Sequence, residues 1–349
     1  MATSHSALHR DVLLSGYVQF WTAPKDNWYL ADWFFPTMRV DKESNLFKRL
    51  NQSTWQQTAE TVVGPDGDVA EVQFYIDPDG QYRCRAHALE GVIDHYDRAR
   101  TDDVVEYEQL QTDIPMVVLA NSLELEAIGT LRDPAKLGTS YKVLAPNELF
   151  DNYLSLNSNP VLEMRKACEH IISEIGRKAN RVGIDFLTWR AMQFNPAMQA
   201  IAPVHTTPAG LQTITVEMLE KKLEDVLEPH SIKITFGRYE TRRGPNQGKK
   251  RSWLGADIPI AYIEPPSLKA IGATQKFSFV GKNSPADDGN PADSIGAYTY
   301  PMPQRGPDGS TIVRVRTNTA FDVVKTESLY VLKNVVDTTD LDLYRGELG

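Results

Sequence analysis

The chain has 349 residues, of which 41% are hydrophobic and 24% are charged, a composition that excludes disordered and fibrous proteins. The length exceeds the usual size of a single hydrophobic core, so we expect one elaborate domain or two closely joined ones. The net charge of −9 is spread along the chain, which argues against a dedicated nucleic-acid-binding protein. Its two cysteines lie far apart without metal-ligand spacing, and we expect no disulfide, metal, cofactor or membrane-spanning segment.

Eight aromatic residues lie between positions 17 and 35: Tyr17, Phe20, Trp21, Trp28, Tyr29, Trp33, Phe34 and Phe35. Buried aromatic side chains remove about 150–250 Å² each from water, and the sum of about 1,200–2,000 Å² equals a standard protein interface. The segment predicts an extended arm with one helical turn over 28–35, capped by Asp26 or Asn27 and stopped by Pro36. We expect Trp33 to Phe35 to anchor on the chain's own body and Tyr17 to Trp21 to reach a neighbour. Deletion of residues 1–36 is then expected to leave a folded core.

A long hairpin is predicted next, with its tip at Gly64, Pro65, Asp66 and Gly67. The return limb, 69–76, alternates apolar and polar residues, whereas the outgoing limb, 54–60, is nearly all polar. The hairpin is therefore expected to project instead of lying in a core. A second turn is predicted at 77–80, followed by one alternating strand with Tyr82, Cys84, Ala86 and Ala88 on the same face.

Four helices are predicted from N-cap residues and from apolar residues three or four apart. They run from Asp113 to Leu131 with Pro115 in the first turn, from Asn159-Pro160 to Gly176, from Phe186 to Phe194 after a cap at Asp185, and from Thr215 to Leu227.

The remaining segments are rich in predicted strands: 181–184, 232–236, 258–262, 277–279 and 312–315. The proline- and glycine-rich region 285–309 is predicted to be a loop or an extended excursion. The chain ends in a predicted hairpin of 321–324 with 329–336. Helices and strands mix without a repeating βαβ order, which favours an α+β fold.

No spacing of catalytic or metal-binding residues is found, so the sequence does not predict an enzyme. Cys168 precedes Glu169-His170, but it falls on the apolar face of a predicted helix and is expected to be a core residue. Basic residues cluster at Arg242, Arg243, Lys249, Lys250 and Arg251, together with Arg238. This cluster either contacts nucleic acid or an acidic neighbour, or it is a solvated hairpin tip.

The order of several segments resembles the major capsid proteins of tailed bacteriophages. Trp28 to Lys42 is similar to their N-terminal arm, and 82–101 resembles the strand and turn before their long spine helix. Residues 159–194 are similar to part of their axial domain, and 253–262 with 323–336 match the usual ending. The resemblance covers most of residues 17–337.

The resemblance implies an α+β capsid fold of the Hong Kong ninety-seven type. The implied parts are an N-terminal arm (1–40), an extended β-hairpin loop (41–80), a peripheral domain with the spine helix (81–150), an axial domain (151–320), and a C-terminal hairpin returning to the peripheral domain with a tail (321–349).

It also implies the function of a major capsid protein that self-assembles into the icosahedral head shell around double-stranded DNA, located in the virion and made in the host bacterial cytoplasm. Implied partners are copies of itself in hexamers and pentamers, a portal, a candidate decoration protein, and DNA bound without sequence specificity. A separate scaffolding protein is also implied, unless the chain is already the processed form. Contacts between subunits are expected at Tyr17, Phe20, Trp21, Trp28 and the tip Gly64 to Gly67. The alternatives are an encapsulin-like compartment shell and an unrecognised cytosolic α+β hydrolase.

Some capsid proteins of this type crosslink a loop lysine to a distant asparagine, but residues 54–76 contain no lysine. We therefore expect particles of this protein to mature without covalent links. On a denaturing gel, boiled particles should give one band at the monomer mass, and a ladder of linked chains would contradict the prediction.

Overall fold

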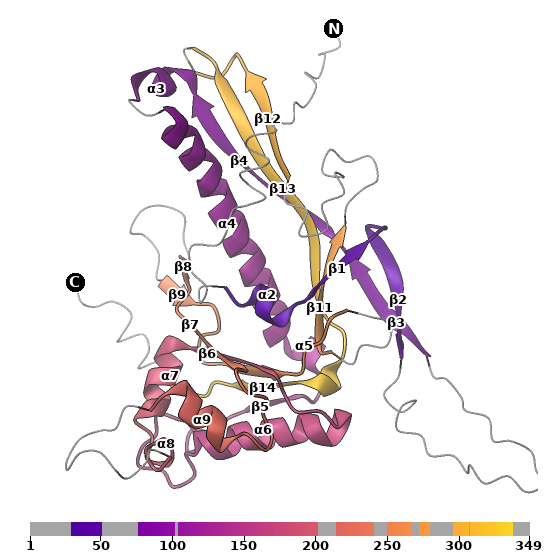
Figure 1. The fold of residues 1–349 in the computed structure, drawn as a ribbon, viewed down its shortest axis with the longest axis vertical. Helices are drawn as coiled ribbons and strands as arrows, with labels where there is room; N and C mark the ends of the chain where they lie inside the picture. The colour runs from indigo at the N-terminus through magenta and orange to yellow at the C-terminus, as the bar shows by residue number, and fades with distance from the viewer. Residues whose placement is uncertain are drawn as a thin grey trace, which may run out of the picture.

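The computed structural model describes residues 29–50, 76–101, 104–201, 214–240, 250–266, 272–279, 296–306 and 308–337. Two five-stranded sheets and one long helix form most of the body, and a two-stranded hairpin projects from its side (Figure 1). Helices and strands alternate irregularly along the chain, as the sequence predicts for an α+β fold.

The first sheet, here called the β13 sheet, is elongated and follows the long helix (Figure 1). Its strand order is β1-β11-β13-β12, and β4 pairs with β13. The bounds are β1 Thr37–Val40, β4 Arg85–Asp94, β11 Thr274–Phe279, β12 Gly296–Met302 and β13 Ser310–Val323. Buried and less buried residues alternate along β13, because one face of the strand carries the apolar contacts.

The long helix is α4, Val104–Arg132, preceded by the short helix α3, His95–Arg100. Apolar side chains three or four residues apart form its buried stripe: Met116, Leu119, Leu123, Ala127, Ile128 and Leu131. The predicted start near Asp113 is wrong, because the helix begins at Val104 and holds Pro115 in its interior.

A glycine on the neighbouring strand explains how α4 accommodates its proline. Pro115 has no N–H to donate to the carbonyl oxygen of Gln111, four residues earlier. Gly91 of β4 packs at this place, and a Cβ there would lie 2.1 Å from the Gln111 oxygen and 3.0 Å from Pro115 Cγ. The helix and the sheet therefore approach each other at a point where a larger residue has no room.

By length and composition alone, one described helical stretch, Tyr107–Arg132, is apolar enough to cross a membrane. Buried core helices pass the same test, and 44% of the stretch's most apolar window is buried inside the protein. Its apolar stripe is the one that packs toward β4 and β13.

The second sheet, here called the β10 sheet, has the strand order β5-β14-β10-β6-β7. Its strands are β5 Tyr141–Val143, β6 Arg181–Asp185, β7 Ile232–Thr235, β10 Ile258–Ala261 and β14 Leu329–Lys333. The short helices around it are α5 Pro134–Leu137, α6 Pro160–Ile175, α7 Phe186–Gln193, α8 Pro196–Gln199 and α9 Val216–Lys222. Figure 1 shows the β10 sheet at the lower end of α4.

Three of the predicted helices are confirmed, and local capping explains two of them. The Asn159 side chain accepts a hydrogen bond from the Leu162 N–H at the start of α6, and Gly176 ends the helix at a φ of 69°. The Asp185 side chain likewise caps α7 by accepting the Leu187 N–H. The third, α9, begins after Thr215 as predicted but ends at Lys222, before the predicted end.

The projecting hairpin pairs β2, Ser44–Leu50, with β3, Ile76–Arg83, so it begins before the predicted outgoing limb. The turn predicted at 77–80 is wrong, because these residues belong to β3. The register shifts between Phe47 and Arg49, which leaves an extra residue on β3. Pro78, which has no N–H for the ladder, is accommodated in this bulge.

The single strand predicted over 82–88 is also wrong. It breaks at Cys84, between β3 and β4, and the buried positions change from Tyr82 and Cys84 to Gly91 and Ile93. The break turns the hairpin away from the β13 sheet (Figure 1).

Two predictions for the C-terminal part need correction. Within 285–309, predicted as a loop or an extended excursion, residues 296–302 form the strand β12 and pair with β13. The predicted terminal hairpin is wrong, because β13 and β14 lie in different sheets and the 3-10 turn η2, Thr326–Ser328, links them. β13 pairs with β4, β11 and β12, whereas β14 pairs with β5 and β10. The segment from β13 to β14 therefore connects the two sheets.

The contact between β4 and α4 predicts an asymmetry between two glycines. Gly91→Ala should lower the free energy of unfolding by about 2–3 kcal/mol, because the new methyl group overlaps the Gln111 carbonyl. Gly129→Ala on α4 is the control, since nothing lies within 4 Å of its added Cβ, and a gain of roughly 0.5–1 kcal/mol is expected. Chemical denaturation measures both; equal stability of the two variants would contradict the predicted packing.

Candidate intersubunit surfaces

The described part of the N-terminal arm begins at Tyr29 and is fixed by a carboxylate from the long helix. The backbone N–H groups of Leu30 and Ala31 donate to Glu124 Oε1 and Oε2 at 2.7 and 2.8 Å. These N–H groups precede and open the short helix α2, Ala31–Phe34, whose own N-cap residue, Leu30, supplies no side-chain cap. Glu124 therefore caps this helix from another element, whereas the sequence predicted a local cap at Asp26 or Asn27.

Glu124 is almost completely buried, and this burial is the main influence on its charge. Desolvation raises its pKa to about 7, although the two backbone hydrogen bonds act in the opposite direction. Among the neighbouring charges, Asp32 raises the pKa and Lys233 lowers it. The carboxylate that positions the arm therefore titrates near neutral pH.

Further contacts fix the same segment. The Tyr29 hydroxyl donates to Asn121 Oδ1 at 2.9 Å, and Lys233 Nζ donates to the Tyr29 carbonyl at 3.1 Å. The Arg181 guanidinium lies 3.8 Å from the centre of the Trp33 ring, a cation–π contact.

The aromatic residues that follow belong to the chain's own core. Phe34 and Phe35 are fully buried, and Phe35 meets Phe321 of β13 edge-on with ring centres 5.3 Å apart. The predicted anchoring of these residues is confirmed. The effect of deleting 1–36 stays a prediction, and we now expect a less stable core, because the deletion removes these side chains and leaves Glu124 buried without its partners.

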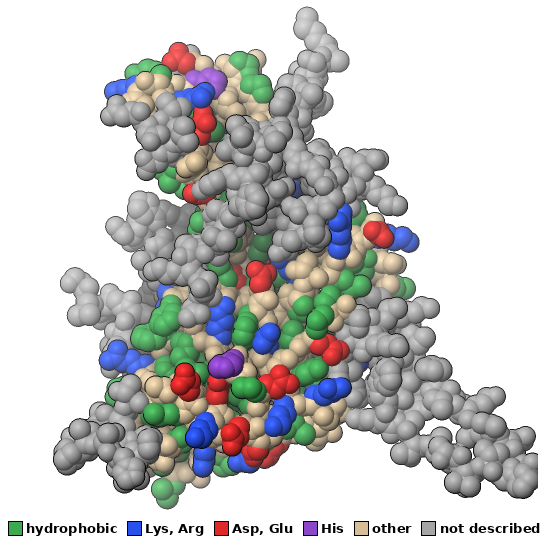
Figure 2. Space-filling model, viewed as in Figure 1, with side chains coloured by type: hydrophobic (Ala, Val, Ile, Leu, Met, Phe, Trp, Pro, Cys, Tyr) green, Lys and Arg blue, Asp and Glu red, His purple; other side chains and the backbone are tan. Residues whose placement is uncertain are grey.

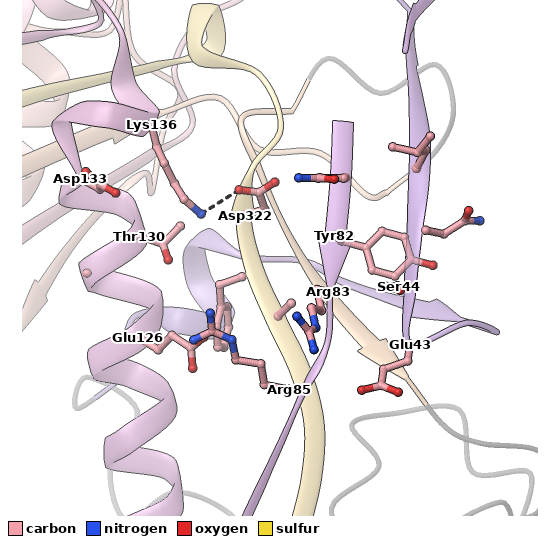
Figure 3. A pocket seen from close by; sticks show the side chains of 16 residues that line it. Glu43, Ser44, Tyr82, Arg83, Arg85, Glu126, Thr130, Asp133, Lys136 and Asp322 are labelled. Carbon is pink, nitrogen blue, oxygen red and sulfur yellow. Dashed lines mark hydrogen bonds and ion pairs between the residues drawn. The ribbon is translucent and has the colours of Figure 1, made fainter. Parts of the chain in front are cut away.

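A cleft of about 1040 Å³ lies where the projecting hairpin joins the body. Residues of the hairpin base, of the C-terminal half of α4 and of β13 line it (Figure 3). The exposed Arg83 and Arg85 face this space together with Glu126, and Lys136 binds Asp322 at 2.9 Å. The cleft presents charges of both signs, which suits an extended polar segment better than an apolar ligand.

The base of the predicted basic loop is a small hairpin of β8, Arg238–Glu240, and β9, Lys250–Ser252. Arg238 does not belong to a free basic surface, because it forms an ion pair of 2.6 Å with the buried Asp185. Arg251 is exposed, and the backbone of Lys250 pairs with Glu240. Arg242, Arg243 and Lys249 lie outside the described residues.

The residues predicted at subunit contacts, Tyr17, Phe20, Trp21, Trp28 and Gly64 to Gly67, also lie outside the described residues. Cys168 is fully buried, and burial raises its pKa to about 12. This confirms the prediction of a core residue. Among the described residues, no group of three His, Cys, Asp or Glu side chains could hold a metal ion.

Glu124 is the functional residue that the sequence reasoning missed. Its only signal was a carboxylate within the apolar stripe of a helix, which a pattern search treats as an interruption. A buried acid needs a donor partner, and this one finds it 93 and 94 residues earlier in the chain.

Charged side chains of both signs alternate in small groups over the lower part of the face in Figure 2. This mixed surface agrees with a net charge that is spread along the chain.

No protein-family model and no curated protein matches this chain. Among solved structures, a phage-related protein from Bordetella bronchiseptica matches with a TM-score of 0.68 and 17% identity, over 94% of this chain and 98% of that one. The capsid protein of cyanophage P-SCSP1u matches with a TM-score of 0.53 and 9% identity, over 89% and 90%. An encapsulin from Synechococcus elongatus matches with a TM-score of 0.50 and 11% identity, over 95% and 97%. The chain has the fold of tailed-phage major capsid proteins.

The buried Glu124 predicts a specific pH dependence of stability. Because its pKa rises from 4.5 to about 7 on folding, the folded state binds more protons in this window, and the free energy of unfolding falls as pH rises through it. The shift corresponds to about 3 kcal/mol. Glu124→Gln should abolish this contribution and cost about 1–3 kcal/mol at low pH, because its amide cannot accept both backbone N–H groups.

Denaturant unfolding between pH 4 and pH 8 measures the effect as the difference between wild type and variant. Glu217→Gln, an exposed residue of α9, is the control for the loss of one carboxylate elsewhere on the surface. Parallel profiles for wild type and Glu124→Gln would contradict the assignment.

Proposed function

We propose that this chain is the major capsid protein of a tailed bacteriophage. It is a structural protein and not an enzyme, and its copies form the hexamers and pentamers of an icosahedral head shell around double-stranded DNA. The fold similarity to a phage capsid protein carries the proposal, because it extends over 89% of this chain and 90% of the other instead of over one shared motif.

The shape of the subunit supports this role. The β2–β3 hairpin leaves the body at its side, where its strands pair with each other and not with the two large sheets (Figure 1). A shell needs surfaces that are not satisfied within one subunit, since a contact between two different surfaces repeats around a ring and closes it. The β2–β3 hairpin and the mixed-charge cleft at its base are two different surfaces of this kind.

The proposal assigns the arm two roles. Residues from Tyr29 onward position the arm on the subunit's own core, whereas Tyr17, Phe20, Trp21 and Trp28 contact a neighbouring copy. The tip Gly64 to Gly67 makes a second contact. On this proposal residues 1–40, 41–80, 81–150, 151–320 and 321–349 act as arm, extended loop, peripheral domain, axial domain and C-terminal segment.

The proposed shell contents follow from charge. An acidic subunit attracts DNA only weakly, which suits packaged DNA that must later leave. The basic loop around Arg242, Arg243 and Lys249 to Arg251 supplies a local contact, to DNA or to an acidic neighbour. A separate scaffolding protein, a portal and a decoration protein are the other proposed partners, and the virion is the proposed location.

The rival with a specific observation in its favour is a compartment shell, because an encapsulin shares the fold at a TM-score of 0.50. It differs in its contents, which would be protein instead of nucleic acid. A cytosolic hydrolase is the rival of a different class.

Electron microscopy of the purified protein, with a candidate scaffolding protein added if needed, tests the proposal. We expect closed shells of uniform diameter, and shells purified from infected cells and treated with nuclease should retain DNA. Protein cargo without DNA would favour the compartment, and a protein that stays monomeric at high concentration would contradict both shell functions.

A deletion of residues 1–28 separates folding from assembly. It preserves the bonds of Leu30 and Ala31 to Glu124, so the melting temperature should change little while closed shells are lost or malformed. Deletion of 1–36 is the matched control, and it should lower the melting temperature because Phe34 and Phe35 leave the core.

A further inference from the structure

Two leucines in the loop before α6 are almost completely exposed. Leu154 and Leu156 keep 98% and 101% of their reference accessible surface, and Tyr153 beside them keeps 41%. We call residues 153–156 the leucine knob. Burial of a leucine side chain is favourable, and the subunit by itself does not obtain this stabilisation from Leu154 and Leu156.

Hydrogen bonds hold the knob in place without burying it. The Tyr153 hydroxyl donates to the Ala191 carbonyl at 3.2 Å, and Ser155 Oγ donates to the Asn147 carbonyl at 2.5 Å. The Ser158 hydroxyl fixes the end of the loop on the Leu149 carbonyl at 2.6 Å. A loop that is already ordered loses little conformational entropy when a partner covers it.

A hollow of about 570 Å³ lies beside α9 in the same part of the molecule. The buried Leu227, the exposed Pro229 and the stems of Lys178 and Lys221 line it. Its rim is fixed, because the Glu220 carboxylate accepts the N–H groups of His230 and Ile232 at 3.2 and 2.9 Å. This volume lies in the range of pockets that take up drug-sized ligands, so it can admit two leucine side chains.

The knob and the hollow are associated with opposite ends of α6. Leu156 precedes the N-terminus of this helix, and Lys178 follows its C-terminus at Gly176. The helix has 16 residues and is therefore about 24 Å long, so the knob cannot fill the hollow of its own chain. Two different surfaces on one subunit that fit each other produce a heterologous contact, which repeats around a ring.

The two surfaces bring no like charges together. The rim of the hollow carries four glutamates, Glu217, Glu220, Glu224 and Glu228, against two lysines. The knob has no charged side chain from Tyr153 to Asn159, and it lies at the N-terminus of α6, the positive end of the helix dipole. No charge on the knob is desolvated when it enters an acidic rim.

We propose that the leucine knob of one copy of this chain inserts into the α9 hollow of the next copy and so links neighbouring subunits within a ring. The inference rests on the proposed shell function and names the contact that forms its rings.

Disulfide crosslinking of the full chain tests this contact. The native cysteines give a low background, because Cys84 and Cys168 are buried and burial raises their pKa to about 11 and about 12. In assembled particles of Leu156→Cys/Lys221→Cys, mild oxidation should give a ladder of linked chains on a nonreducing gel. The control Leu156→Cys/Leu110→Cys places the second thiol on the exposed surface of α4 and should give no ladder.

A second variant tests the energy of the contact. Leu154→Ser/Leu156→Ser should keep the wild-type melting temperature, since both side chains are exposed, but should raise the concentration needed for assembly roughly tenfold or more. Leu110→Ser, which replaces another exposed leucine, is the matched control and should assemble as wild type does.

The outcomes separate the two proposals. Wild-type shells together with normal assembly of the double serine variant and no ladder from Leu156→Cys/Lys221→Cys would overturn the inference and leave the shell function intact. A wild-type chain that forms neither shells nor linked chains at high concentration would overturn both.

Discussion

A single buried carboxylate fixes the position of the N-terminal segment from Tyr29 onward. Glu124 lies in the middle of the long helix, and it binds the two backbone N–H groups that open α2. Phe34 then packs next to Gly183 of the β10 sheet, while Phe35 meets Phe321 of the β13 sheet. The arm segment thus fills the junction of both sheets, and its position fixes their relation. Burying a carboxylate is energetically unfavourable, as the raised pKa of Glu124 indicates. The hydrogen bonds from Leu30 and Ala31, which hold the arm segment between the two sheets, offset part of this cost.

The C-terminal end of the same helix is fixed to the β10 sheet by cations. Arg132 Nε donates to Asp257 Oδ2 at 2.5 Å, and Lys333 Nζ donates to the Arg132 carbonyl at 3.0 Å. Cations near the last carbonyl groups are favourable because this end of a helix carries partial negative charge. The Asp257 carboxylate also accepts the Asn334 N–H, just after β14. The long helix therefore connects the described arm segment, the β13 sheet and the β10 sheet into one body from which the β2–β3 hairpin projects.

Local chemistry decided which elements the sequence could predict. The Asn159-Pro160 start and the Gly176 end of α6 were predicted because caps depend on neighbouring residues alone. Pro115 misled the prediction of α4, since the glycine that makes room for it is 24 positions earlier on β4. The turn-forming residues at 77–80 lie instead in β3, with a bulge, because β2 pairs with them across the hairpin. The partners of β13 and β14, and of Glu124, depend on contacts distant in sequence, and no local pattern contains them.

The aromatic N-terminal segment and the leucine knob both carry large apolar side chains that are more stable when covered. For Phe34 and Phe35 the chain itself provides the answer, because both sheets close around them. For Leu154 and Leu156 it does not, although hydrogen bonds from Tyr153 and Ser155 fix their loop to the body. Exposure of an ordered apolar surface to water is unfavourable. A second copy that covers the surface removes this exposure, and the loop does not have to change its conformation. On the proposed shell function, a subunit with buried core residues and uncovered apolar residues on its surface would fold first and assemble afterwards.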